Sequence, residues 1–417
     1  MSVTVKRRRK KLPLFTLLRP GGGMSRLNES ELVRLFDDKT ASKVIECFNA
    51  LDGTPDFHSP IVWRSTIPEL CRLDCARTRR GIDAHGAAQM VNLFRFFGGL
   101  SLDLRDVPGL GHGRLLSLAK GQAFEAFLRD VASGESFAAI CITEASGGSD
   151  LHSLQTTAVR CEGGYTLTGC KHYVARLRQA NLYVVFANVA GLDRSLSVFL
   201  VPASADGIVV HDIPALGLQG RSWGALELNQ VFVPKQHRVG GEGQGFSLFS
   251  THFSYWRCAM AAAAIGAAQA TLDRCKERLQ HRQAFDGPIG RFTHLQQGYA
   301  QHAARLHMAW LLVQSTALRL DKQAYCYIDA AMAKAESVEI AIAAAQWAML
   351  IHGAEGCCVS TGLEKNLRDL LGLRIADGTP DVLRGQVARG LLGETLYSLS
   401  LGRQAVSPKW SRERQLW

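Results

Sequence analysis

Residues 142–150 read Ile-Thr-Glu-Ala-Ser-Gly-Gly-Ser-Asp, and this stretch decides how the rest of the chain is interpreted. Its small residues let a backbone approach a planar or charged ligand closely. Thr143 and Ser149 add hydroxyl donors near its two ends. Taken alone, the stretch predicts a polar, glycine-rich turn at the entrance to a sheet, and most turns of this kind are simply loops.

Hydrophobic periodicity divides the chain into three zones around this turn. Residues 29–140 carry apolar positions three and four apart, as in Ala88–Phe97, which predicts helices. Residues 141–246 change to a period of two, as in Tyr165–Thr168 and Leu226–Val233, which predicts strands. Residues 247–400 return to long helical patterns such as Ala330–Ile351. A basic leader over residues 1–28 and a tail over residues 401–417 flank these zones.

We therefore expect an α+β multidomain chain. It should contain an N-terminal helical domain, a middle antiparallel β-domain and a C-terminal four-helix bundle. The chain of 417 residues is long enough to bury a large core in two or three domains. A small ligand at the junction of the domains is the natural place for function.

Charge and cysteine usage exclude several other classes of protein. Residues 1–23 carry seven basic residues and no acidic one, which leaves +4 of the net charge of +11 for the rest of the chain. This distribution argues against a nucleic-acid partner and favours a disordered leader over an export signal, with Met24 as a possible natural start. The eleven cysteines are scattered, which predicts reduced thiols, a cytoplasmic protein and no bound metal. No apolar run is long enough for a membrane helix.

At least six motifs, in the right order over about residues 85–395, resemble the acyl-CoA dehydrogenase family. The turn at 142–150 resembles the family's T-E-x-x-x-G-S-D, and Asp377-Gly378-Thr379, eight residues after Asp369, resembles its R-D … E-G-T segment. The others are Gly164–Lys171, Leu216–Leu218, Val231–Pro234, Gly243–Phe246 and Arg282–Ile289, the last resembling R-x-x-F-x-x-P followed by Ile or Leu. Each motif alone is weak, and together they are specific.

The resemblance implies an oxidoreductase that binds FAD and removes hydrogen from the α,β-bond of an acyl thioester, either acyl-CoA or acyl-carrier-protein. Arg282 and Phe285 would come from a neighbouring subunit, which implies a homodimer or homotetramer. The implied substrate contacts are Ser149, Ser254, Arg257 and Gly378. The implied FAD contacts are Ile142, Thr143, Gly148, Ser149, Tyr173, Ala175, Arg282, Phe285, Gln296, Gly353 and Thr379.

The reaction needs a carboxylate that removes the proton next to the thioester carbonyl. In the resemblance this base is a Glu of the E-G-T segment, and Asp377 stands in its place. Trp256 stands at the second position that some members use, and an indole cannot act as a base. Asp377 could instead cap the helix expected near Pro380, and both roles could hold.

The chain departs from the family pattern where the cofactor would be held. Asp377 is one methylene shorter than Glu, Tyr173-Val174-Ala175 replaces W-(I/S)-(T/S), and Leu350 replaces a Gln. These changes suggest a divergent member, of secondary metabolism, that acts on carrier-bound acyl groups. Two alternatives remain open: a monooxygenase on the same fold that uses reduced flavin, and a non-catalytic member with a vestigial site. The electron acceptor cannot be read from the sequence.

Overall fold

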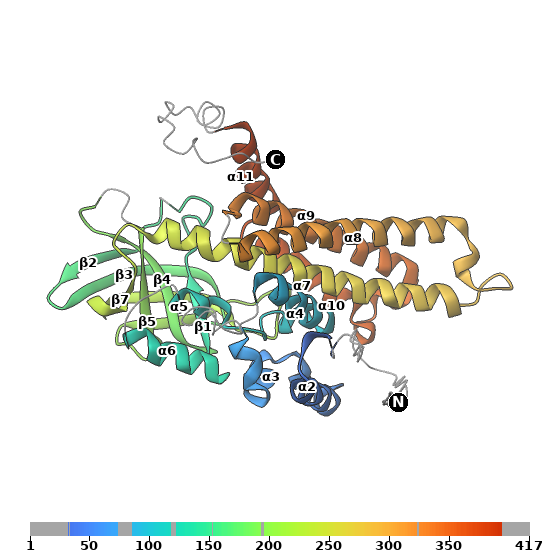
Figure 1. The fold of residues 1–417 in the computed structure, drawn as a ribbon, viewed down its shortest axis with the longest axis horizontal. Coiled ribbons are helices and arrows are strands. Elements are labelled where there is room, and N and C mark those ends of the chain that lie inside the picture. The colour runs from blue at the N-terminus through green and yellow to red at the C-terminus, as the bar shows by residue number, and fades with distance from the viewer. Residues whose placement is uncertain are drawn as a thin grey trace, which may run out of the picture.

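The computed structural model describes Leu32 and residues 34–73, 86–117, 122–151, 153–192, 196–322 and 325–393. The expected leader and tail lie outside these residues. Figure 1 shows helices at the start of the described chain, a sheet in the middle and long helices side by side towards the end. This arrangement confirms the fold class that the sequence predicts.

The N-terminal helices are α2 (Asp38–Leu51), α3 (Pro60–Thr66), α4 (Ala87–Leu100), α5 (Arg114–Ser117) and α6 (Gln122–Ser133). Helix α2 begins where the side chain of Asp37 accepts a hydrogen bond of 2.8 Å from the backbone N–H of Thr40. Helix α4 packs against α7 (Gly245–His281) without room for a side chain, because a Cβ on Gly98 would lie 2.3 Å from the carbonyl oxygen of Ala263. Glycine thus joins the N-terminal helices closely to the bundle.

The middle of the chain forms one sheet with strand order β6-β7-β3-β2-β4-β5-β8, and β1 also pairs with β4. Most neighbours run antiparallel, as expected, but β1 and β2 both pair with β4 in parallel, so the sheet is mixed. The sheet has its own buried core, which includes Leu167, Val185 and Phe199. The strands are β1 (Phe137–Cys141), β2 (Thr157–Cys161), β3 (Gly164–Ala175), β4 (Ala180–Val189), β5 (Leu196–Pro202), β6 (Ile208–Asp212), β7 (Trp223–Pro234) and β8 (Arg238–Val239).

The C-terminal helices are α7, α8 (Thr293–Asp321), α9 (Tyr327–His352), α10 (Leu363–Ile375) and α11 (Pro380–Leu392). Helix α7 is the longest of the described helices, with 37 residues, and runs from the sheet along the whole bundle (Figure 1). Its buried alanines at 259 and 261–264 allow α4 and α9 to approach it closely. The bundle and the sheet are therefore tied by one continuous helix.

One helical stretch among the described residues, Tyr327–Cys357, is long and apolar enough to cross a membrane by length and composition alone. It contains α9, which packs against α7, α8, α10 and α11. A core helix of a bundle meets the same two criteria, so they give no separate evidence for a membrane span.

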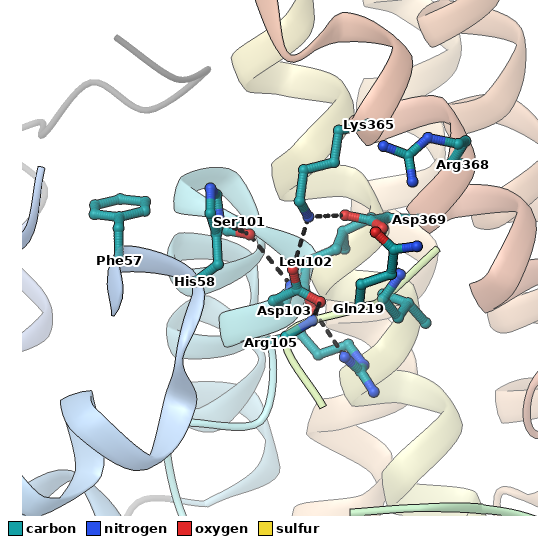
Figure 2. A network of polar contacts seen from close by, with 12 residues as sticks. Phe57, His58, Ser101, Leu102, Asp103, Arg105, Gln219, Lys365, Arg368 and Asp369 are labelled. Carbon is teal, nitrogen blue, oxygen red and sulfur yellow. Dashed lines mark hydrogen bonds and ion pairs between the residues drawn. The ribbon is translucent and has the colours of Figure 1, made fainter. Parts of the chain in front are cut away.

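A network of polar contacts holds the three zones together (Figure 2). Lys365 on α10 binds Asp103 of the N-terminal zone at 2.7 Å and Asp369 at 2.5 Å. The two carboxylates in turn accept backbone N–H groups from the loop between β6 and β7, Asp103 from Gly220 at 3.0 Å and Asp369 from Leu218 at 2.5 Å. The family motif at Leu216–Leu218 therefore lies where sheet and bundle meet.

Candidate active site

Asp377 lies in the short turn between α10 and α11, in a backbone conformation that a non-glycine residue seldom adopts. Its φ is +61°, and that of Gly378 is +107°. Thr379 is the N-cap of α11, since its hydroxyl accepts the N–H of Val382 at 3.4 Å. The cap role that the sequence left open for Asp377 therefore belongs to Thr379, and the Asp377 carboxylate is left for other contacts.

Three donors hold the turn around Asp377. The indole N–H of Trp256 donates to its Oδ2 at 3.1 Å, and Nε of Arg257 donates to its carbonyl oxygen at 3.2 Å. Nζ of Lys334, fully buried on α9, donates to the carbonyl of Gly378 at 2.7 Å and to that of Arg374 at 3.0 Å. Oδ1 of Asp377 has no hydrogen-bond partner within the described residues. The turn is thus fixed while one carboxylate oxygen remains available.

Two predicted substrate contacts lie on α7, Arg257 beside this turn and Ser254 one turn before it, and their own hydrogen bonds go to the protein. Arg257 is 2% exposed and also donates to the side chain of Gln386 at 3.0 Å. Ser254 is buried, and its hydroxyl donates to the carbonyl of Ser250 at 2.7 Å. The hydrogen bond from Arg257 therefore holds the backbone of the Asp377 turn, and this contact does not require a substrate.

A buried histidine pair, which the sequence analysis missed, adjoins the same site. Nδ1 of His112 lies 2.9 Å from Nε2 of His252, and the ring of His112 packs on Trp256 with centroids 4.3 Å apart. Burial lowers the pKa of His112 to about 4 and holds that of His252 well below its usual value. Both rings are therefore neutral at physiological pH. The one available signal was the spacing of His252 and Trp256, which lie one turn apart on α7.

The turn at 142–150 is tightly closed on itself. Glu144 and Gly147 exchange two backbone hydrogen bonds of 3.0 Å, and a Cβ on Gly148 would lie 2.8 Å from Oγ1 of Thr143. Ser149 is exposed at the end of the turn, and the carbonyl of Thr143 accepts the N–H of His172 at 2.7 Å. That last bond ties the turn to the predicted flavin-flanking segment, which begins at the next residue.

An ion pair beneath the turn is a second feature that the sequence analysis missed. Nζ of Lys171 lies 2.6 Å from Oε1 of Glu144, with side chains 0% and 5% exposed, and it also donates to the carbonyl of Ile142 at 3.0 Å. Glu144 further accepts hydrogen bonds from Gln155 and Thr156. Burial would raise the pKa of Glu144, but these hydrogen bonds lower it to about 2. The pair fixes the backbone of the turn from inside the sheet.

Tyr173 and Ala175 lie at the end of β3, next to the turn. Tyr173 is 52% exposed with φ +60°, and its carbonyl accepts the indole N–H of Trp223 at 2.9 Å. Ala175 is paired with Trp223 across β3 and β7. The backbone bond from His172 to Thr143 joins this aromatic edge to the 142–150 turn.

The remaining predicted cofactor contacts lie at the other end of the bundle. Arg282 ends α7, 28 residues beyond Ser254, which is roughly 40 Å along a helix. Phe285 is 80% exposed, Gln296 is exposed and Gly353 has open space where a Cβ would be. Arg278 binds Glu355 at 2.5 Å and thereby links the Arg282 turn to the Gly353 loop. Within one chain, the predicted cofactor contacts therefore fall into two groups that lie far apart.

Comparison with known proteins gives this architecture its class. The family model for the acyl-CoA dehydrogenase middle domain matches residues 139–231, and the model for the acyl-CoA dehydrogenase C-terminal domain matches residues 243–392. The chain is built of the two domains that define these flavoenzymes, in the expected order.

Individual relatives agree with that class. Benzylmalonyl-CoA dehydrogenase of Aromatoleum aromaticum is 30% identical over 67% of this chain and 74% of its own length. L-prolyl-(peptidyl-carrier protein) dehydrogenase of Pseudomonas fluorescens is 30% identical over 66% and 74%. A glutaryl-CoA dehydrogenase from Mycobacterium smegmatis, solved in complex with FADH2, superposes with a TM-score of 0.76 at 19% identity over 86% and 96%. This chain belongs to the acyl-CoA dehydrogenase family of oxidoreductases, as its motifs predict.

Proposed function

We propose that this chain uses FAD to remove hydrogen from the α,β-bond of an acyl thioester, with Asp377 as the base. The construction around Asp377 carries the proposal. Oδ2 and the backbone of Asp377 are held by Trp256 and Arg257, while Oδ1 is without a partner among the described residues. A base needs such fixed geometry together with a free lone pair.

The donor groups of the chain fit FAD in two places. At the entrance to the sheet, Thr143, Ser149 and the close-approach backbone at Gly148 suit the flat ring system. At the far end of the bundle, Arg282 has no hydrogen bond from its guanidinium among the described residues, and Phe285 presents an exposed ring. A guanidinium suits a phosphate and an exposed aromatic ring suits an adenine.

The distance between the two groups supports an oligomer. Thr379 follows the turn that Arg257 holds, and Arg282 lies 25 residues beyond Arg257, roughly 40 Å along a helix, which is too far for one FAD to contact both. Arg282, Phe285, Gln296 and Gly353 would therefore serve the FAD of a neighbouring subunit, as the resemblance implies. We propose a homo-oligomer on this ground.

When bound, FAD supplies the two-electron acceptor for the hydride that leaves the β-carbon. Asp377 Oδ1 takes the proton from the α-carbon, and the indole of Trp256 keeps the carboxylate oriented. The thioester arm belongs either to CoA or to a carrier protein. The relatives support both, since one is named for benzylmalonyl-CoA and another for a prolyl group on a carrier protein.

The test is anaerobic mixing of the purified protein with a panel of acyl-CoA and acyl-carrier-protein thioesters, followed by flavin absorbance. We expect bleaching by at least one thioester, and its loss in Asp377→Asn with FAD still bound. Asp381→Asn, an exposed acid in the first turn of α11, is the matched control and should bleach at the wild-type rate.

Three results would count against the proposal. Bleaching of Asp377→Asn at the wild-type rate would show that Asp377 is not the base. A protein that binds no flavin would favour the vestigial alternative. A flavin that no thioester reduces, but that oxygenates a substrate when a reductase supplies reduced flavin, would favour the monooxygenase.

A further inference from the structure

Trp256 covers one oxygen of the proposed base. Its indole N–H donates to Oδ2 of Asp377 at 3.1 Å, and the residue is 2% exposed. The α-carbon of a substrate therefore meets the other oxygen, Oδ1, at about 3–3.5 Å, the separation of reacting atoms. Because the two oxygens belong to one carboxylate, a carbon in that place lies beside the indole. Trp256 is thus placed to touch the acyl group.

Three other rings pack around the indole and leave it no room to withdraw. The ring centroid of His112 lies 4.3 Å from that of the indole, that of His252 lies at 6.0 Å, and that of Phe94 lies at 6.1 Å. Phe94 and His252 are each 1% exposed, so the space between these rings is already filled. An extra methylene forced into such packing is destabilising.

Backbone contacts fix the helix that carries Phe94. This helix, α4, lies against α7, which carries Trp256 (Figure 1). One turn after Phe94, a Cβ on Gly98 would collide with the carbonyl of Ala263. A Cβ on Gly266 would collide with the carbonyl of Arg95. Separating the two helices to admit a chain would open gaps along this contact, so the rings between them form a fixed wall.

The turn that carries the base is fixed as well. Lys334 donates to the carbonyl of Gly378 at 2.7 Å, and Arg257 donates to that of Asp377 at 3.2 Å. A Cβ on Gly378 would lie 2.8 Å from Cδ2 of Leu383, which is fully buried. The separation of carboxylate and indole is therefore set from both sides, and an acyl group has to fit the room that is left.

We propose that Trp256 determines the chain length of the substrate and restricts it to a short acyl group, with few carbons beyond the β-carbon. This inference rests on the proposed function, because it names the substrate class of the site at Asp377. In an open apolar pocket each further methylene would tighten binding about 4-fold. Beside a wall of packed rings, a longer chain has to displace a ring or stay in water, and it gains no affinity.

The test measures binding of S-butyl and S-octyl phosphopantetheine to the FAD-loaded enzyme by titration calorimetry. Phosphopantetheine is the arm that CoA and carrier proteins share. A thioether has no activated α-proton, so binding is read without turnover. The octyl thioether should bind the wild type no more tightly than the butyl thioether does.

Two variants of Trp256 separate its size from its hydrogen bond. Both Trp256→Phe and Trp256→Leu lose the N–H that binds Asp377, and leucine leaves more room than phenylalanine. The octyl-to-butyl ratio of affinities should rise about 4-fold in Trp256→Phe, the effect of one buried methylene, and about 15-fold in Trp256→Leu, that of two. Trp256→Phe, the more conservative change, decides the question alone if Trp256→Leu does not fold.

Trp310→Leu is the control. It removes another buried indole that contacts α4, since the guanidinium of Arg95 lies 4.8 Å from the Trp310 ring. The octyl-to-butyl ratio of this variant should equal that of the wild type.

Four outcomes would overturn the inference. They are tighter binding of the octyl than of the butyl thioether by the wild type, no binding of the butyl thioether, a ratio that neither variant of Trp256 changes, and an equal rise in both variants, which would assign the effect to the lost hydrogen bond. The proposed function is read separately, from flavin bleaching by thioesters. A protein whose flavin no thioester bleaches loses that function whatever its preference for chain length, so the two failures are distinguishable.

Discussion

Lys334 is a buried cation whose replacement by methionine should remove a pH-dependent part of the stability. Its side chain is fully buried on α9 and donates two hydrogen bonds to the turn that carries Asp377. Burial lowers the pKa of Lys334 to about 7, although the Asp377 charge acts in the opposite direction. The folded protein therefore binds the proton of Lys334 less tightly than the unfolded chain does.

The size and sign of the effect follow from this difference. The pKa falls from 10.5 to about 7, and each unit is worth about 1.4 kcal/mol. Between these two values the unfolded chain binds more protons, so the free energy of unfolding rises with pH there and is flat below pH 7. From pH 6 to pH 9 the wild type should gain about 3 kcal/mol relative to Lys334→Met. The lost hydrogen bonds cost about 1–3 kcal/mol each at every pH and cancel in this comparison.

Urea unfolding of the FAD-loaded protein at pH 6, 7.5 and 9 measures the effect. The difference in the free energy of unfolding, wild type minus Lys334→Met, should rise with pH and be smallest at pH 6. Lys322→Met, at the exposed end of α8, is the control and should run parallel to the wild type. A gap that stays constant from pH 6 to pH 9 would refute the reasoning, because Lys334 would then keep its proton throughout.

Two further substitutions, each with a control, test the predicted cofactor contacts and the turn at 142–150. Arg282→Ala should lower FAD retention through gel filtration, whereas Arg305→Ala, exposed on α8, should not, and equal retention in both would contradict a role in binding phosphate. Glu144→Gln leaves the buried charge of Lys171 without its partner and should cost about 3–5 kcal/mol in the free energy of unfolding. Glu336→Gln, in the more exposed pair with Arg384, should cost about 1 kcal/mol or less, and similar losses in the two variants would argue against the buried pair as the anchor of the turn.

The sequence predicts the order of helical and strand zones because each zone has its own local pattern of apolar residues. The period change near residue 141 marks the start of the sheet, and the spacing of Arg368 and Asp377 marks the turn of the base. Periodicity does not reveal the parallel pairing of β1 with β4, because side chains alternate in the same way in parallel and antiparallel strands. The parallel pairing in the sheet is therefore evident only from the structure.

The missing site residues were missed because their partners are far apart in the chain. His112 and His252 are separated by 140 positions, and Lys334 reaches a carbonyl 44 positions away. Neither contact leaves a local motif. The departures from the family pattern, by contrast, were visible at once, but their consequences depend on which side chains surround them.

The two departures nearest the chemistry explain each other in the structure. Aspartate places its carboxylate one methylene further back than glutamate would, and Trp256 fills the position where some relatives carry their base. The indole of that same Trp256 donates to Oδ2 of Asp377 and packs against the tilted ring of His112. Asp377, Trp256 and the histidine pair thus form one chain of direct contacts, so the shorter acid and the tryptophan belong to a single local change.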